Sequence, residues 1–289
     1  MPRSTDPEKH PEQPRPAADG ADVRENMLAV VAAATSKITP VTLQRKLRKA
    51  FGYERRQVRD GLAGLVAKGE LNYIDEAGRT IVEMAFNRPV RVSRKIFLVP
   101  AGLALADEKE KVPVVIQPGA AFGDGRHPST RLALTGVEWA VDQLFPLSGR
   151  SAATVLDIGT GSGVLLVAAL RLGIGSGIGL DIDPCAVSEA TTNIRLNGLT
   201  ARAVVSHHGI QKLDREYALI CANLRWPTLK SMRDPIKQRL QPGGALLVSG
   251  IQSAEVTALT AWYAKAGFRC RWQSERCGWA AVVMQPADR

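Results

Sequence analysis

The sequence has few of the residues that build metal sites or disulfide frameworks. Its 289 residues include only four cysteines and four histidines. No two cysteines have the CxxC spacing of a zinc site or redox motif, and the histidines are scattered. We therefore predict no bound metal and a reducing, cytoplasmic location, with His207 and His208 at the surface. The full set is Cys185, Cys221, Cys270, Cys277, His10, His127, His207 and His208.

Long hydrophobic runs are also missing. No apolar stretch approaches the roughly 20 residues that a membrane-spanning helix needs. The segment from Met1 to Asp22 is rich in proline and charge and has no apolar stretch typical of a signal peptide. We predict a disordered tail over residues 1–21. The length and the 45% content of hydrophobic residues are enough for two domains with a sizeable core.

Acidic residues are fewer than basic ones. The formal net charge is +10, and most of the excess lies between Asp22 and Lys95. A basic surface suits nucleic acid, but also ribosomes or acidic proteins. Aromatic residues make up only 5% of the chain. None is interleaved with Arg55, Arg56 and Arg59, which weakens the case for a single-strand binding surface.

Residues 22–90 are predicted to form a small α+β domain. Three segments have apolar residues at helical spacing, and breaks at Thr39-Pro40 and Gly52-Tyr53 separate them. Two short strands follow, Leu71–Ile74 and Thr80–Met84, on either side of a hairpin turn. Three helices and a hairpin are typical of a winged helix. The helical apolar positions are Met27, Val30, Val31, Ala34, Leu43, Leu47, Phe51, Val58, Leu62, Leu65 and Val66.

In a winged helix the third helix lies in a major groove, and here its outward side carries Arg55, Arg56 and Arg59. Nucleic-acid contact through these arginines is one hypothesis. Protein docking is an equal alternative, and a solvated face with a purely structural role is a third.

The run Val155–Gly163 predicts a nucleotide-like cofactor site. It is an apolar strand entering a glycine-rich turn, which lets the backbone approach a ligand and presents the free N–H groups of the next helix. Asp181 closes the next predicted strand, where an acid binds ribose hydroxyls. Either NAD or S-adenosylmethionine is compatible. The GxGxG spacing of Gly159, Gly161 and Gly163, and the position of Asp157 two residues before it, favour S-adenosylmethionine.

Residues 91–289 are predicted to form a doubly wound α/β domain. Seven strand candidates are mostly separated by helical stretches, and the last two lie close together, so the terminal strand is expected to pair antiparallel. That ending is typical of the seven-stranded, Rossmann-like class I methyltransferase fold. The candidates are Thr154–Ile158, Ser176–Ile182, Ala203–His207, Tyr217–Ala222, Ala245–Ser249, Phe268–Gln273 and Trp279–Met284.

A more specific signature precedes this sheet. The segment Gln117–Thr130, with the sequence QPGAAFGDGRHPST, resembles the corresponding segment of PrmA-type ribosomal protein lysine methyltransferases. The likeness spans residues from about 94 to 284. It continues through Asp157–Gly163, Asp181–Val187, Asn193, Asn197-Gly198, Ala222–Leu224, Gln241–Gly244 and Ser249–Ile251.

The resemblance implies a protein amine, possibly of a ribosomal protein, as the methyl acceptor. By position, Thr130, Gly159, Asp181 and Asn223 match the family's cofactor contacts, with Thr130 in the loop that closes over the methionine end. Asp157, Gly161 and Gly163 join them from the strand and glycine argument above. The family's usual front domain is ferredoxin-like, so a winged helix here would be a departure. Asp124 and the run Leu224–Pro227 also differ from the family pattern.

Two side chains are candidates for work at the acceptor. Asn223 emerges from the fourth strand beside the expected methyl position and can align an amine through its carbonyl oxygen. His127 can relay a proton, but a hydrogen bond that braces its loop is the favoured role. Arg225 and Trp226 are expected beside the acceptor channel, and Trp279 in sheet packing.

Other functions stay open at this level. They are an RNA or DNA methyltransferase guided by the winged helix, a small-molecule methyltransferase, and a DNA-binding regulator that senses the cofactor. The sequence after Ala222 lacks the two prolines and aromatic residue common in base-amine methyltransferases, which counts against the first. The intact cofactor motif and Asn223 count against the regulator.

Overall fold

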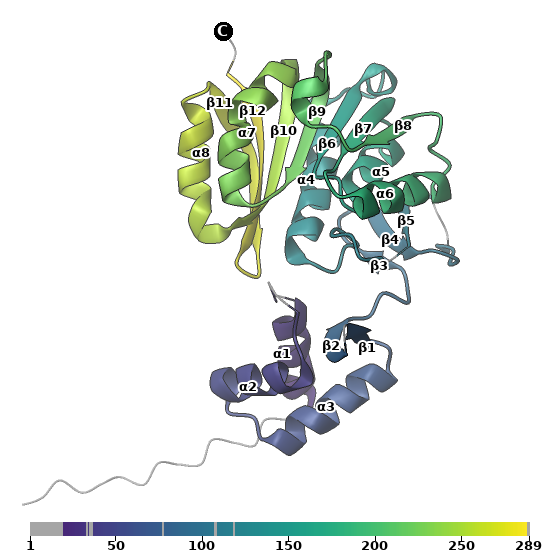
Figure 1. Cartoon of the computed structure of the whole chain (residues 1–289), viewed down its shortest axis with the longest axis vertical. Coiled ribbons are helices and arrows are strands. Elements are labelled where there is room, and N and C mark those ends of the chain that lie inside the picture. Colours follow the sequence, from purple (N-terminus) through teal and green to yellow (C-terminus); the bar gives the residue numbers. More distant parts are fainter. Residues whose placement is uncertain are drawn as a thin grey trace, which may run out of the picture.

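The computed structural model describes residues 20–32, 34, 37–76, 78–106, 109–117 and 119–287. The tail predicted over residues 1–21 lies outside these ranges up to residue 19, and the first helix, α1, already begins at Gly20. None of the helices in the described ranges has the length and hydropathy needed to span a bilayer. Figure 1 shows a small front domain beside a larger domain built on one sheet.

The front domain contains the three helices and the hairpin that the sequence predicts. They are α1 (Gly20–Ala32), α2 (Pro40–Phe51), α3 (Arg55–Ala67), β1 (Leu71–Glu76) and β2 (Arg79–Met84). The Thr39 side chain caps α2 by accepting from the amide of Thr42, and Gly52, at φ 75°, ends it. Ile38 forms an isolated bridge to Val82 in the hairpin. The winged-helix assignment remains our interpretation of this order.

Three short strands between the two domains were not predicted. They are β3 (Val90–Arg91), β4 (Ile96–Pro100) and β5 (Val112–Ile116), and they form a separate sheet in the order β3-β4-β5. Such short strands give little periodic signal in the sequence. Asn193 and Asn197 of α6 (Pro184–Leu196) and the turn after it hydrogen-bond the backbone at Gln117 and Val115. These bonds fix the start of the segment that leads to the site.

The large domain is a seven-stranded sheet in the order β11-β12-β10-β9-β6-β7-β8. The strands β6 to β10 run parallel, and β12 pairs antiparallel with both its neighbours, as expected. The bounds are β6 Thr154–Ile158, β7 Ser176–Leu180, β8 Ala203–Ser206, β9 Tyr217–Asn223, β10 Leu240–Gln252, β11 Phe268–Arg276 and β12 Trp279–Pro286.

Helices cover both faces of this sheet (Figure 1). The helices α4 (Pro128–Leu144) and α5 (Val164–Arg171) share one apolar core with the sheet, and α7 (Trp226–Arg239) and α8 (Val256–Ala264) share the other. Successive residues of β9 alternate between them, because side chains along a strand point to opposite faces. Leu219 and Cys221 enter the first core and Ile220 and Ala222 the second.

Candidate cofactor and acceptor site

A cavity lies at the carboxyl ends of β6, β7 and β9. Its volume is about 620 Å³, within the range of small-molecule sites. Parallel sheets bind ligands at this edge, where the strand order reverses on either side of the first strand. Of the predicted site residues, Gly159, Gly161, Asp181, Asn223 and His127 line it.

The glycine loop follows β6 and forms one wall of the cavity. Gly159 and Gly161 have positive φ values of 67° and 53°. A Cβ on Gly161 would lie 2.2 Å from the carbonyl oxygen of Phe122, so no larger residue fits without moving the backbone. The loop therefore stays close to the segment from residue 119 to 127, and the amide of Ser162 donates to the same Phe122 oxygen.

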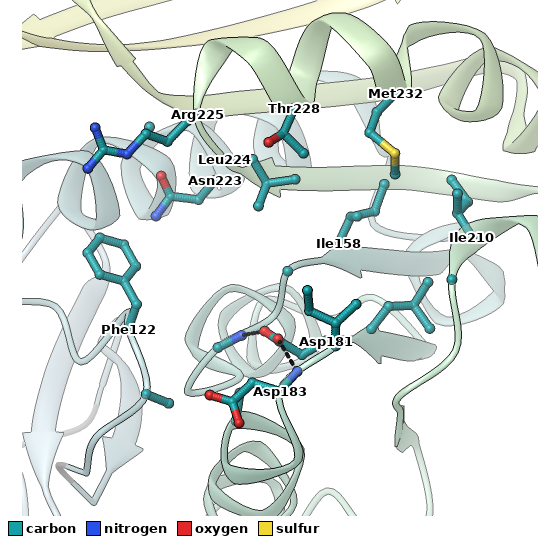
Figure 2. Close-up of a pocket in the computed structure, with 18 of the residues that line it drawn as sticks. Phe122, Ile158, Asp181, Asp183, Ile210, Asn223, Leu224, Arg225, Thr228 and Met232 are labelled. Atoms are coloured by element: carbon teal, nitrogen blue, oxygen red, sulfur yellow. Dashed lines mark hydrogen bonds between the residues drawn. The ribbon is translucent and has the colours of Figure 1, made fainter.

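Asp181 follows β7 directly and lies beside the glycine loop. Its carboxylate accepts hydrogen bonds from the backbone amides of Gly161, at 2.9 Å, and Asp183, at 3.0 Å (Figure 2). These bonds fix the carboxylate at the cavity wall. It is half-buried and keeps acceptor capacity for ligand hydroxyls, as the sequence argument requires.

Asp157, Gly163 and Thr130 are not among the residues that line the cavity. Asp157 is fully buried and accepts from the Thr160 hydroxyl and the Leu166 amide, so it organises the glycine loop from behind. Burial raises the pKa of Asp157 to about 7, against the effect of these hydrogen bonds. Gly163 is the N-cap residue before α5 and packs closely against Ala190.

Thr130 lies in the first turn of α4, not in a loop as expected. His127 and Pro128 start the helix before this position. The Thr130 hydroxyl is fully buried and 3.5 Å from Nδ2 of Asn223. Thr130 is thus placed to hold Asn223 from behind.

Asn223 is the last residue of β9, and its side-chain amide is only partly hydrogen-bonded. Its Oδ1 atom is buried and has no hydrogen-bond partner among the described residues. A buried amide oxygen left unpaired costs about 1–3 kcal/mol, so a site that keeps one is suited to a ligand donor. Figure 2 shows Asn223 beside Arg225, with Phe122 pointing toward them from the opposite wall.

His127 braces the start of α4. Its Nδ1 accepts from the Ser129 amide, and its ring lies between Phe122 and Trp279, with centroids at 5.2 and 4.6 Å. Burial, and then the charge of Arg225, lower the pKa of His127 to about 4. The ring is therefore neutral near pH 7. Trp279 is buried against the sheet, as predicted, and also reaches the cavity.

The opposite end of the cavity is apolar and was not predicted from the sequence. Figure 2 shows Ile158, Ile210 and Met232 there, away from Asn223. Ile182, next to Asp181, is 89% exposed although it lines the cavity. His208 lies on this rim as well as at the surface. Of these apolar residues, only Ile182, beside Asp181, could have been found from the local sequence. The other three come from β6, α7 and the segment after β8, which only the fold brings together.

Polar contacts at two places hold the segment from residue 119 to 127, which lies against the glycine loop. Glu189 of α6 accepts from the amides of Ala120 and Ala121. Arg126 is paired with Asp124 in the same segment and with Glu83 of β2 in the front domain. Burial raises the pKa of Asp124 to about 6, although the Arg126 amide hydrogen bond opposes this. The front domain is therefore linked directly to the site wall.

These features fit S-adenosylmethionine. The cavity offers an apolar end for a base, the Asp181 carboxylate for ribose hydroxyls, a close backbone turn, and the Asn223 side chain at the far end. Cysteine, histidine and acidic side chains form no cluster that could hold a metal ion within the described ranges.

Comparison with known proteins identifies the family. The sequence model of the family described as ribosomal protein L11 methyltransferase (PrmA) matches residues 57–287. Ribosomal protein L11 methyltransferase of Symbiobacterium thermophilum is 32% identical over 249 residues, covering 84% of this chain and 77% of that protein. The protein of the same name from Dechloromonas aromatica is 36% identical over 205 residues, covering 71% and 65%.

A solved structure agrees with these relatives. The crystal structure of ribosomal protein L11 methylase from Lactobacillus delbrueckii subsp. bulgaricus aligns with a TM-score of 0.61 and 25% identity, over 70% of this chain and all of that one. The chain therefore belongs to the ribosomal protein L11 methyltransferase (PrmA) family and is a class I methyltransferase that uses S-adenosyl-L-methionine.

Proposed function

We propose that the protein methylates amino groups of a ribosomal protein of the L11 type. The observation that carries this proposal is Asn223, which lines the end of the cofactor cavity and whose buried Oδ1 has no hydrogen-bond partner among the described residues. This oxygen is an acceptor suited to the N–H of an amine. The names of the relatives support a ribosomal protein as the source of that amine. The cytoplasm, where ribosomal proteins are made, is the proposed location.

When bound, S-adenosylmethionine supplies a methyl group on a sulfonium centre, which is already an activated leaving group. The protein then has to hold, orient and desolvate the reactants. Asp181 and the backbone around Gly159 and Gly161 hold the nucleoside end, by the fit described above. Phe122 and Trp279 narrow the other end and exclude water.

The acceptor ammonium must lose one proton to water before its nitrogen can attack the methyl group. A lysine amine has a pKa of about 10.4, so the neutral form near pH 7 costs about 4–5 kcal/mol. The Oδ1 of Asn223 accepts an N–H of the amine and directs its lone pair along the cavity. The positive charge of Arg225 beside it lowers the pKa of the amine, as it does that of His127. A dedicated base is not required.

The front domain is proposed to select the acceptor. Residues 22–90 form the reader, and residues 91–289 the transfer domain. The support is the ion pair between Glu83 of β2 and Arg126, which joins the hairpin to the site wall.

The test is transfer of labelled methyl groups. We would incubate the purified protein with methyl-labelled S-adenosylmethionine and the large ribosomal subunit of its host, before and after protease or nuclease treatment. Label in one protein band, lost to protease and located on an amine by mass spectrometry, is the expected result. Label lost to nuclease would contradict the proposal and favour a nucleic-acid acceptor. Label in neither would exclude a ribosomal acceptor.

A further inference from the structure

Helix α2 carries four exposed basic residues, and three of them, Arg45, Arg48 and Lys49, lie together. Their spacing of three and four residues puts them on one side of the helix, opposite the buried Leu43 and Leu47. All three are exposed, and α2 contains no acidic residue. We call these three residues the α2 face.

The α2 face lacks an electrostatic partner among the described residues. None of its residues forms an ion pair with any of the residues that the structure describes. On the neighbouring helix, Arg56 and Arg59 both approach Asp60, at 3.8 and 3.1 Å. Their charges are partly neutralised, whereas those of the α2 face are available for an anionic partner.

The two helices are joined as in a helix-turn-helix unit. Only Gly52, Tyr53 and Glu54 lie between α2 and α3, and Gly52 supplies the left-handed conformation at φ 75°. Tyr53 is buried in the front-domain core, which fixes the turn. In such units the first helix crosses the phosphate backbone and the second presents its N-terminal residues to base edges. The N-terminal turn of α3 begins with Arg55 and Arg56.

The second helix is shaped for close approach to a groove. Beyond its arginines, the exposed side of α3 carries the small residues Ala63 and Ala67. Figure 1 shows α2 and α3 on the part of the front domain away from the seven-stranded sheet. The catalytic domain therefore does not cover this surface.

We propose that α2 and α3 dock on B-form duplex DNA. The α2 face contacts phosphates, and α3 enters the major groove with Arg55 and Arg56 at the base edges. The major groove of B-form DNA admits a helix, whereas that of an A-form RNA duplex is too deep and narrow for side chains to read. This inference concerns binding alone and does not depend on the identity of the methyl acceptor.

The experiment is fluorescence anisotropy of the full-length protein with a labelled 20-base-pair DNA duplex at about 50 to 200 mM salt. The variant Arg45→Gln/Arg48→Gln/Lys49→Gln is compared with Lys237→Gln/Arg269→Gln/Arg271→Gln, which removes the same charge from exposed positions of the catalytic domain. We expect the first variant to bind at least tenfold more weakly and its salt slope to fall by about three, since each lost phosphate contact lowers the slope by about one. The second variant binds like the wild type.

Three results would overturn the proposal. They are equal weakening by both triple variants, tighter binding of an RNA duplex of the same sequence, and no binding by the wild-type protein at 50 mM salt. Binding of S-adenosylhomocysteine and the thermal unfolding midpoint are measured for both variants, so that misfolding is separated from loss of the surface. If the wild-type protein bound the DNA duplex but transferred no methyl group to a ribosomal protein, the proposed function would be contradicted and this inference would stand.

Discussion

In the proposed mechanism, the transfer step depends most directly on the side-chain amide of Asn223. We predict that Asn223→Ala lowers kcat by at least tenfold, because an aligned acceptor for the amine is lost, and each 1.4 kcal/mol of transition-state stabilisation is a factor of ten. The affinity for S-adenosylhomocysteine changes much less. Single-turnover rates and isothermal titration calorimetry measure the two effects. The matched control is Asn72→Ala on the exposed side of β1. Equal losses in rate and in affinity would contradict an alignment role.

We predict that the neutral ring of His127 stabilises the folded protein. Its folded-state pKa of about 4 lies below the ordinary 6.5, so the unfolded chain takes up a proton first as the pH falls. The stability contributed by the neutral ring is present above pH 6.5 and is lost as the pH falls through about 4. We expect the unfolding free energy of the wild type to drop over this window relative to His127→Asn, which keeps a capping acceptor for Ser129.

Urea unfolding of both proteins between pH 4 and 7 measures that difference. Asp124 and Asp157 have raised pKa values and respond in the opposite direction, but they are common to both proteins and cancel in the comparison. An NMR titration of His127 with a midpoint near 6.5 would show the prediction to be wrong.

At the scale of elements, the glycine loop and the segment before α4 form one wall. We predict that Gly161→Ala abolishes measurable cofactor binding, because its Cβ would lie 2.2 Å from the Phe122 carbonyl oxygen. The control Gly198→Ala also has a positive φ, 67°, but its Cβ meets nothing within 4 Å. It should lose only about 1 kcal/mol of stability from the strained backbone. If both variants bound S-adenosylhomocysteine equally well, the close approach would have no role.

The ion pairs of Arg126 connect two elements from different domains. We predict that Glu83→Gln increases hydrogen exchange in residues 119–127 several-fold, because Arg126 then keeps only its partner Asp124. The control Glu25→Gln changes an exposed acid on α1 and should leave this segment protected. Unchanged exchange in the Glu83 variant would mean that Asp124 alone holds the segment.

Local spacing in the sequence was enough to predict the glycine loop, Asp181 and the strands that precede them, whereas Asn223 was expected from the family resemblance. Local spacing could not separate residues that line the cavity from those behind it. Asp157 and Gly163 lie in the same motif as Gly161 but do not line the cavity, because Asp157 accepts a hydrogen bond from the Leu166 amide and Gly163 packs against Ala190. Ile210 and Met232 come from distant segments without a motif, so only the folded chain brings them together.

On the scale of the whole molecule, the chain consists of two parts with separate hydrophobic cores. The front-domain core around Met27, Leu43 and Leu62 shares no residue with the two cores of the large sheet. The basic excess and the proposed reader role belong to the first part, and the cofactor cavity to the second. The two parts should therefore be separable in function.

Removing residues 1–89 should leave cofactor binding nearly intact and reduce methylation of the protein acceptor. The described residues that line the cavity all follow residue 119, so the affinity for S-adenosylhomocysteine should change less than threefold. Without the hairpin that carries Glu83, whose ion pair with Arg126 joins the front domain to the site wall, we expect kcat/KM for the intact acceptor to fall at least tenfold. A short peptide that contains the methylated amine should be modified at a similar rate by both forms. Equal activity of the truncated and full-length proteins on the intact acceptor would exclude the reader role, because the transfer domain would then select the acceptor by itself.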